Sequence, residues 1–539
     1  MDHLAEDLST MIRRPLTAAH IDLLRRAGVT RDVAAGEIVV KGDALADQFH
    51  FVEAGEFELF DLRRQSRIGA NSLGAGQFIG EIAFLNGAAV LNSVRAVTAG
   101  RIISTPRASV LPLMAAEPEM SDIIVSVLAA RRRGALDAGF GAVTVVGPED
   151  DRQVRAVAAF AGRNRLPIRF IDPRTEGAAD LGATYNFNPA ADPHIIFGDG
   201  EVLDGVSPAV LAARRGLAFD PGTAGTFDLV IVGGGPAGVA AAVYAGSEGL
   251  SALVVEDLAI GGQAGTSSRI ENYMGFPTGI SGADLCWRGE IQAMKFGTRF
   301  ALPHRVVNIV PQEGGWCLTL DNDARVLARA VLISTGVEYR QMALPGIQAL
   351  EGAGIYYAAT EVEARFCRDT DVVVVGGGNS AGQAAMYLSR STKHVHVLVR
   401  GASLAASMSS YLVERLTRAA NITVHYRAQI TAVHGDTMLE GVTIHDQSQA
   451  QDWRIDARAV FVMVGAAPNT GWLQGRVALD AQGFVLTGVA AGSAGQYATS
   501  CPGIFAVGDV RAGSVKRVAS AVGEGSLVVS EIWAHLNPR

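Results

Sequence analysis

Two glycine-rich segments have the residue types and spacing that bind the pyrophosphate of a dinucleotide. In the first, Gly233, Gly235 and Gly238 form a G-x-G-x-x-G pattern after an apolar run, with Pro236 and Ala237 inside it. Glycine lets the backbone approach a pyrophosphate, and the free N–H groups at the start of the following helix favour an anion. The pattern predicts an adenine dinucleotide site, the alternative being a turn that needs glycine only for tight packing.

A carboxylate follows this motif where a ribose would lie. Glu256 ends the next predicted strand, about 20 residues after the glycines, and an acidic side chain there accepts hydrogen bonds from both hydroxyls of an adenosine ribose. Glu256 therefore strengthens the prediction of a dinucleotide site.

The second glycine-rich segment is followed by an arginine where the first is followed by Glu256. It places these residues at the corresponding positions: Gly376, Gly378, Asn379, Ser380 and Ala381. Its second predicted strand ends in Arg400, and a guanidinium pairs with a 2′-phosphate that a carboxylate would repel. We therefore expect NADPH in preference to NADH, the alternative for Arg400 being a solvated residue at a strand end.

Both motifs need a strand, a turn, a helix and a second strand to position them. Residues 228–256 and 371–400 both have this pattern, and each begins with an apolar run typical of a parallel strand buried on both faces. Ahead of them, short strand-like runs over about 30–110 predict a small all-β unit, closed by a helix over about 118–133. Residues 143–217 alternate strand and helix, and 219–226 has the composition of a linker.

Composition excludes several functions. Lys and Arg total 46 against 54 Asp and Glu, a net charge of −8, and no long basic block occurs. Binding to nucleic acid lacks its electrostatic driving force. No apolar run reaches 18 residues, and the first residues do not have the pattern of a signal peptide. We expect no nucleic-acid partner, no membrane contact and a cytoplasmic location.

The four cysteines are Cys286, Cys317, Cys367 and Cys501. They form no CxxC pair and have no spacing typical of metal ligands. We expect neither a metal site nor a disulfide framework, and thiol chemistry is impossible before residue 286.

From about residue 226 onward the chain resembles the low-molecular-weight thioredoxin reductases. The motifs occur in the family's order: GGGPAG (233–238), GGQAGTSSRIENYMGFP (261–277), ISTGVEYR (333–340), GGGNSA (376–381), VGAAPNT (464–470) and GIFAVGDV (503–510). The resemblance implies an FAD domain in two pieces with an NADPH domain inserted between them.

The resemblance also implies roles for particular residues. Gly262, Gln263 and Asn272 would lie along the flavin, and Asp509 would bind the ribityl chain, the alternative for Asp509 being a helix N-cap. The segment from Lys516 would cap the edge of the flavin ring. The remaining residues implied to contact FAD are Gly336, Gly508, Arg517, Val518 and Ala519.

The family's redox-active CxxC is absent. Ala358 and Glu361 stand at the two cysteine positions, and neither side chain forms the thiolate that such a relay needs. No catalytic residue is therefore assigned with certainty, and a plain helix start is the leading interpretation of this stretch. Cys367 and Cys501 are interpreted as structural thiols.

Residues 36–60 and 78–87 resemble the cyclic-nucleotide-binding jelly roll. Gly80 and Glu81 match the family's phosphate cassette, but Val90 stands where the family has its phosphate-binding arginine. Without that guanidinium the cyclic phosphate loses roughly 1.5–3 kcal/mol. Arg95 is expected to point elsewhere on its strand. Cyclic nucleotide binding is therefore doubtful, and docking or another ligand is favoured.

Residues 141–217 resemble a thioredoxin or glutaredoxin fold without cysteines. Pro193 stands at the position of that fold's cis-proline. The resemblance implies a scaffold, a spacer or a dimer contact with no redox activity of its own.

The predicted fold is multidomain: a β jelly roll, a small thioredoxin-like α/β unit, and two Rossmann-like three-layer α/β domains. The predicted boundaries are 1–135 (cyclic-nucleotide-binding-like), 141–217 (thioredoxin-like), 226–345 (FAD, first part), 346–470 (NADPH) and 471–539 (FAD, second part).

The expected function is that of an FAD-dependent NADPH oxidoreductase without an internal dithiol. The chemistry would be carried by the cofactors, FAD and NADPH. Its acceptor stays open among a protein disulfide, ferredoxin, a quinone and oxygen. The resemblance implies a homodimer. Two alternatives are a redox or nucleotide sensor with little or no catalysis, and a disulfide reductase that uses Cys367 or Cys501.

Overall fold

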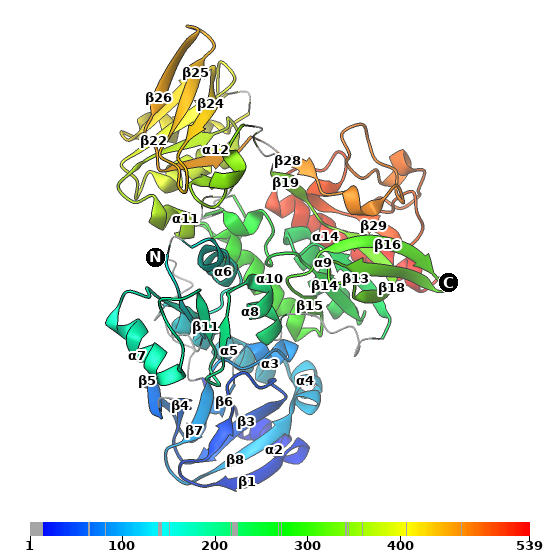
Figure 1. Cartoon of the computed structure of the whole chain (residues 1–539). Helices are drawn as coiled ribbons and strands as arrows, with labels where there is room; N and C mark the ends of the chain where they lie inside the picture. The colour runs from blue at the N-terminus through cyan, green and yellow to red at the C-terminus, as the bar shows by residue number, and fades with distance from the viewer. Residues whose placement is uncertain are drawn as a thin grey trace.

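The structure, a computed structural model, describes residues 14–62, 65–80, 82–137, 143–149, 151–215, 217, 225–267, 269–270, 272–339, 342, 344–357, 359, 361–405, 407–464 and 466–538. Figure 1 shows a β-rich unit at one end, a small α/β unit beside it, and two larger α/β lobes. The four parts follow one another in the chain, except that one lobe is inserted into the other.

Residues 14–137, here called the jelly roll, form two four-stranded antiparallel sheets with strand orders β1-β8-β3-β6 and β2-β7-β4-β5. Val52 and Ile102 of one sheet share an apolar core with Phe57 and Val94 of the other. The strands are β1 (Val29–Val33), β2 (Ile38–Val40), β3 (Gln48–Ala54), β4 (Phe57–Asp61), β5 (Ser66–Leu73), β6 (Phe78–Ile79), β7 (Ser93–Ala96) and β8 (Gly100–Pro106). The helices are α2 (Ala18–Ala27), α3 (Ala83–Asn86), α4 (Arg107–Ala116) and α5 (Pro118–Asp137).

Residues 143–217, the second module, form a four-stranded mixed sheet of order β10-β9-β11-β12. Strand β10 runs parallel to β9, and β11 runs antiparallel to both β9 and β12. The elements are β9 (Val143–Val146), α6 (Arg152–Arg163), β10 (Ile168–Ile171), α7 (Glu176–Tyr185), β11 (His194–Ile196), β12 (Val202–Asp204) and α8 (Pro208–Arg214). Pro193, which stands at the position of the thioredoxin fold's cis-proline, has a trans peptide bond before it; the cis peptide bond among the described residues precedes Pro303.

The first lobe comprises residues 225–339 and 466–538 and contains a seven-stranded sheet. Its order is β15-β14-β13-β18-β17-β16, and β29 pairs with the end of β18. The strands are β13 (Phe227–Val232), β14 (Ala252–Val255), β15 (Arg299–Ala301), β16 (Val306–Gln312), β17 (Gly315–Leu320), β18 (Arg325–Ile333) and β29 (Ile504–Ala506). Its helices are α9 (Pro236–Ser247), α10 (Gly282–Lys295) and α14 (Val518–Leu536). The four buried strands β13, β14, β18 and β29 run parallel, as the apolar runs predict.

The second lobe, residues 344–464, has a five-stranded parallel sheet of order β20-β27-β21-β22-β23 and a three-stranded antiparallel sheet β24-β25-β26. A short antiparallel pair, β19 (Val337–Tyr339) with β28 (Ala466–Pro468), carries the chain between the lobes. The strands are β20 (Ile355–Tyr356), β21 (Asp371–Val375), β22 (His394–Val399), β23 (Ile422–Tyr426), β24 (Ala428–His434), β25 (Gly441–Asp446), β26 (Gln451–Ile455) and β27 (Ala459–Val462). The helices are α11 (Glu361–Phe366), α12 (Asn379–Leu388) and α13 (Ser410–Arg418).

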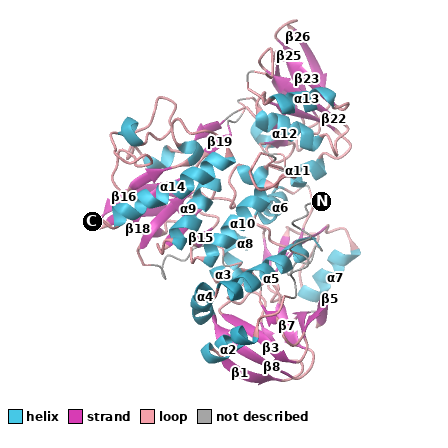
Figure 2. Ribbon diagram, turned by 180° about the vertical axis from the view of Figure 1, so that it is seen from behind, coloured by secondary structure: helices cyan, strands magenta, loops and turns pink. Residues whose placement is uncertain are grey.

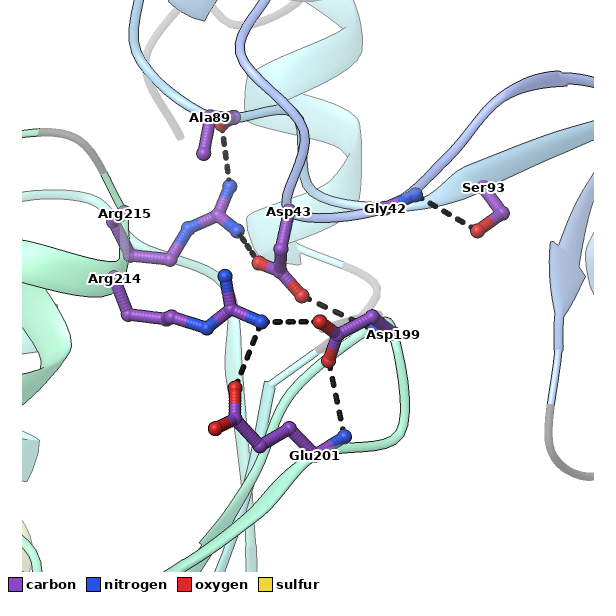
Figure 3. Close-up of polar contacts among 8 residues, drawn as sticks. All are labelled: Gly42, Asp43, Ala89, Ser93, Asp199, Glu201, Arg214 and Arg215. Atoms are coloured by element: carbon purple, nitrogen blue, oxygen red, sulfur yellow. Dashed lines mark hydrogen bonds and ion pairs between the residues drawn. The ribbon is translucent and has the colours of Figure 1, made fainter.

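The jelly roll, the second module and the first lobe pack directly against one another. Figure 3 shows the Arg215 guanidinium paired with the carboxylate of Asp43, and it also donates to the Ala89 carbonyl at 2.6 Å. Helix α10 of the first lobe adds Trp287, Ile291 and Met294 to the apolar core of the jelly roll. Figure 2 shows α10 beside α3 and α5 from behind. The jelly roll is therefore docked through a shared core rather than tethered.

In the part of the chain that the structure describes, no helix is long and apolar enough to cross a membrane.

Candidate functional site

The first glycine motif forms the turn between β13 and α9. Gly233 has φ +107°, and a Cβ there would lie 2.4 Å from the Ser334 carbonyl oxygen, so only glycine fits. Gly235 is the N-cap of α9, caps it with no side chain, and has open space where a Cβ would stand. The N–H groups at the start of α9 are therefore available to an anion.

The buried carboxylate of Glu256 lies against this turn. It accepts hydrogen bonds from the backbone N–H groups of Gly234 at 2.7 Å, Leu258 at 3.2 Å and Ala259 at 3.4 Å. Burial, and then the neighbouring Asp257, raises its pKa to about 7. The carboxylate is thus fixed beside the anion-binding turn, where a ribose diol would donate to it.

Two distant segments meet the same turn. A Cβ at Gly262 would lie 3.1 Å from the Cα of Gly235, and a Cβ at Gly508 would lie 3.0 Å from the Cβ of Ala237. The Gly261 N–H donates to the Gly234 carbonyl at 2.8 Å. The fold therefore brings the GGQ and GDV segments to the glycine turn, although they are far apart in the sequence.

Three other residues predicted along a flavin, Gln263, Asn272 and Gly336, lie in loops or turns. The Gln263 side-chain amide donates to the Val337 carbonyl at 3.4 Å, which ties the GGQ segment to strand β19. Asn272 is exposed. Gly336 has φ +61° and open space around the position of a Cβ.

The GDV segment is followed by the start of α14. Burial raises the pKa of Asp509, and Lys516 opposes that shift. The Lys516 ammonium lies 4.6 Å from the centre of the Phe484 ring. Arg517 is the N-cap of α14, and Val518 and Ala519 are its first two residues.

Sequence reasoning missed the pair that holds the GDV segment. Glu524 accepts from the Gly508 N–H at 2.7 Å and from the Arg511 guanidinium at 2.5 Å and 3.3 Å. The side chains of Arg511 and Glu524 are 16% and 11% exposed, so this pair is poorly screened by water. One turn of α14 therefore fixes the backbone next to Asp509.

The second glycine motif forms the same kind of turn between β21 and α12. Gly376 has φ +146°, and a Cβ there would lie 2.3 Å from the Met463 carbonyl oxygen. Gly378 is the N-cap of α12 and caps it with no side chain. Ser380 is exposed in the first turn of α12, and Ala381 is buried beneath it. This helix start also suits an anion.

A serine-containing loop that the sequence did not predict covers this second turn. Ser407 donates to the Gly377 carbonyl at 2.7 Å, and the Asn379 side-chain oxygen accepts from the N–H of Ser409 at 2.7 Å and from its hydroxyl at 2.9 Å. Arg400 is exposed, and its guanidinium has no ion-pair partner among the described residues. Arg400 is therefore available to a phosphate at the end of β22.

The four thiols are free and separate. Cys286, Cys317 and Cys367 are buried, and Cys501 is partly exposed. Burial is the main cause that raises the pKa of Cys286 and of Cys367 to about 12, and it also raises the pKa of Cys501. Cys286, which sequence reasoning did not single out, lies near the GGQ segment, with its Sγ 4.0 Å from the Gly261 carbonyl oxygen.

Of the residues at the two CxxC positions, Ala358 lies outside the described residues. Glu361 begins helix α11, as a plain helix start requires. Among the described residues, no group of three or more His, Cys, Asp or Glu side chains is arranged to hold a metal ion.

Part of the predicted phosphate cassette of the jelly roll lies among the described residues. Gly80 precedes α3, Glu81 lies outside the described residues, and Val90 is buried. Arg95 points to the buried carboxylate of Glu58, with its Nε 3.0 Å from the oxygen, as expected from its strand position. Val90, at the position that the resemblance assigns to the phosphate-binding arginine, is therefore a buried apolar side chain.

Comparisons with known proteins find two families in the chain. The sequence model of the pyridine nucleotide-disulphide oxidoreductase family matches residues 227–525, and that of the cyclic nucleotide-binding domain matches residues 30–117. The chain is 35% identical to a thioredoxin reductase of Mycolicibacterium smegmatis over 57% of its own length and 96% of that protein. It is also 35% identical to a thioredoxin reductase of Treponema pallidum, over 58% of its own length and 97% of that protein.

Solved structures give the same match. The crystal structure of thioredoxin reductase from T. acidophilum is 29% identical, with a TM-score of 0.53 over 57% of this chain and 98% of that one. The Lactococcus lactis thioredoxin reductase is 26% identical, with a TM-score of 0.53 over 58% of this chain and 99% of that one.

Proposed function

Because the chain belongs to the pyridine nucleotide-disulphide oxidoreductase family, we propose that it is an NADPH-dependent flavoprotein oxidoreductase that works without a dithiol of its own. Its cofactors are FAD and NADPH, as in its thioredoxin reductase relatives. The two cofactors supply a hydride donor and a ring that takes up the electron pair.

The proposal rests on a contrast between the two glycine turns, which suit nucleotides, and the four cysteines, which do not suit a disulfide relay. Two complete anion-binding turns stand in the two lobes, each with a glycine that no other residue replaces without a clash. The four cysteines, in contrast, form no disulfide, and burial keeps the thiols of Cys286 and Cys367 protonated at neutral pH. Nucleotide binding is thus supported, and an internal disulfide relay is not.

In this proposal the protein binds and orients the two nucleotides. The starts of α9 and α12 hold the pyrophosphates, Glu256 holds the adenosine ribose of FAD, and Asp509 the ribityl chain. Arg400 pairs with the 2′-phosphate of NADPH. Glu524 and Arg511 keep the GDV backbone in place for Asp509.

The electron balance requires an external acceptor. NADPH is oxidised to NADP⁺ by loss of a hydride, and the two electrons leave to a protein disulfide, a quinone or oxygen, or singly to two ferredoxins. Protons come from or return to solvent. Among the described residues, the buried thiols offer no intermediate store for the pair.

An anaerobic titration with NADPH tests the proposal. Flavin absorbance should bleach with about one equivalent of NADPH per FAD, because no dithiol takes up a second electron pair. Candidate acceptors are then added one at a time, and the one that restores the absorbance identifies the reaction. Binding of NADPH without bleaching would refute the enzyme proposal.

A redox sensor is the second candidate, and helix α10 favours it. The Gly282 N–H donates to the Ser267 carbonyl at 2.9 Å, close to the GGQ segment, while Trp287, Ile291 and Met294 lie in the jelly-roll core. One helix thus connects the proposed flavin site to the jelly roll. Amide exchange in the jelly roll that differs between oxidised and reduced protein would support this function.

Three further expectations stay proposals. The strand order β10-β9-β11-β12 of the second module supports a thioredoxin-like fold. The separate sheets support the predicted domain boundaries. The homodimer and the cytoplasmic location stay predictions.

A further inference from the structure

Three consecutive residues of the second module bind the first lobe beside its glycine turn. At the end of α6, the Arg163 guanidinium donates to the Gly262 carbonyl at 3.3 Å, and the Asn164 amide donates to the Leu258 carbonyl at 3.0 Å. Arg165 forms an ion pair with Asp284. Figure 1 shows α6 between the first lobe's α10 and the second lobe's α11.

The loop that Arg163 and Asn164 bind, residues 256–263, lies against the glycine turn. It carries Glu256 at one end and Gly262 at the other, and Gly261 and Gly262 have φ +119° and +50°. It contains no helix or strand. Its Leu258 and Ala259 N–H groups donate to the Glu256 carboxylate, and its Gly261 N–H donates to the Gly234 carbonyl. The end of α6 adds hydrogen bonds to two loop carbonyls, those of Leu258 and Gly262.

The ion pair at the end of α6 is well shielded. The Arg165 and Asp284 side chains are 13% and 17% exposed, and the Arg165 guanidinium lies 4.8 Å from the centre of the Trp287 ring. Arg133 adds a second contact to Asp284 at 3.3 Å. Burial alone would raise the pKa of Asp284, but Arg165, the Ser281 hydroxyl and Arg133 together outweigh burial and lower that pKa. Asp284 is therefore a carboxylate at neutral pH.

The backbone of Arg165 favours a specific role for its side chain. Arg165 has φ +52° immediately after the helix C-cap, Asn164. Glycine adopts this conformation without strain, whereas in other residues it costs of order 1 kcal/mol or more. Arg165 carries this backbone strain, and its side chain forms the ion pair with Asp284. Glycine would avoid the strain but could not form the pair.

We propose that the second module, which has no cysteine, is a positioning element of the flavin site: Arg163 and Asn164 hold loop 256–263 against the glycine turn, and Arg165 fixes the end of α6 to Asp284 of helix α10. The proposal rests on the proposed function only in placing FAD beside this loop. It gives the module a function that needs no redox chemistry. Arg163 and Asn164 position the loop, Arg165 anchors α6 beside it, and none of the three takes part in hydride transfer.

The test compares the full chain with an R163Q/R165G double variant. Glycine at 165 relieves the positive φ, so α6 keeps its fold while the contacts with Gly262 and Asp284 are lost. R152Q is the matched control, since Arg152 is exposed at the other end of α6. Two quantities are measured: the dissociation constant of FAD, and amide hydrogen exchange in the FAD-free protein.

The double variant should bind FAD about tenfold or more weakly, the factor expected for one lost charged hydrogen bond. Exchange should rise within residues 256–267 and stay unchanged in the strands of the first lobe. FAD affinity and loop exchange equal to those of R152Q would overturn the proposal. A wild-type chain that binds FAD but is not reduced by NADPH would count against the proposed function alone, because neither readout here involves turnover.

If the R163Q/R165G variant misfolds, a substitution of Asp284, the partner of Arg165, still tests the proposal. D284N removes the carboxylate and leaves α6 intact. If Arg165 acts through Asp284, the D284N/R165G double variant should bind FAD no more weakly than the weaker of the two single variants. Fully additive losses would contradict that coupling.

Discussion

Arg215 of the second module and Asp43 of the jelly roll form an ion pair whose side chains are 3% and 0% exposed (Figure 3). The Ala89 backbone closes the contact from both sides, since it donates to the Arg215 carbonyl at 3.1 Å and accepts from its guanidinium at 2.6 Å. The segment of the jelly roll that would hold a nucleotide phosphate is thus bound to a neighbouring module.

Removing one partner of this pair should destabilise the junction strongly. D43N leaves the Arg215 guanidinium buried without its carboxylate, at a cost of about 3–5 kcal/mol. Asparagine tolerates the positive φ of Asp43, 63°, so the effect reports the lost charge. Urea unfolding of the jelly roll measures it. D32N, which breaks the exposed Asp32–Arg101 pair, should shift the midpoint far less, and equal shifts in the two variants would contradict the prediction.

Cyclic AMP should not bind. Val90 is buried where a guanidinium would be needed, and Arg95 is held by Glu58. Any ligand that binds the folded state raises its stability by mass action. Millimolar cyclic AMP should therefore leave the melting temperature unchanged, and an increase that saturates with concentration would disprove this prediction.

Replacing Arg400 should change the nucleotide preference. R400Q removes a charged partner of the 2′-phosphate, and the KM for NADPH should rise roughly 10- to 100-fold while that for NADH changes little. Steady-state kinetics with both nucleotides measures the change. R418Q, an exposed arginine on α13, is the control. The prediction fails if R400Q raises both KM values equally.

The thiols of Cys367 and Cys501 should be dispensable for NADPH oxidation. Replacement of Cys367 and Cys501 by serine should leave NADPH oxidation unchanged, because Cys367 lies in the apolar core of the second lobe and Cys501 packs against that of the first. Turnover with each candidate acceptor is the measurement. A loss of activity with a disulfide acceptor alone would restore the disulfide-reductase alternative.

Acid should destabilise the second lobe through His396. Burial, and then His394 and His425, lowers its pKa from 6.5 to about 4. Between these values the unfolded chain binds more protons than the folded one, so stability falls as the pH drops from 6.5 to 4. H396Q should flatten this decline in unfolding midpoints measured against pH. The H445Q control, on the separate sheet of the same lobe, should not.

The features that could be predicted from the sequence are those set by a few neighbouring residues, such as the two glycine turns. Gly233 and Gly376 lie in tight strand-to-helix turns, and the motif that contains each of them specifies its turn directly. Contacts between distant segments had no such signal: Arg163 meets Gly262, and Ser409 meets Asn379, only after the sheets assemble. The trans bond before Pro193 shows that fold-level analogy does not fix a backbone isomer.

Helix α10 has a consequence for how the protein can be divided. Trp287, Ile291 and Met294 complete the jelly-roll core although they belong to the first lobe. A fragment that begins at residue 226 would present these three side chains to water as an apolar stripe, and such stripes promote self-association. The two lobes are therefore expected to aggregate when expressed alone. In the full chain, the jelly roll shields these three side chains from water.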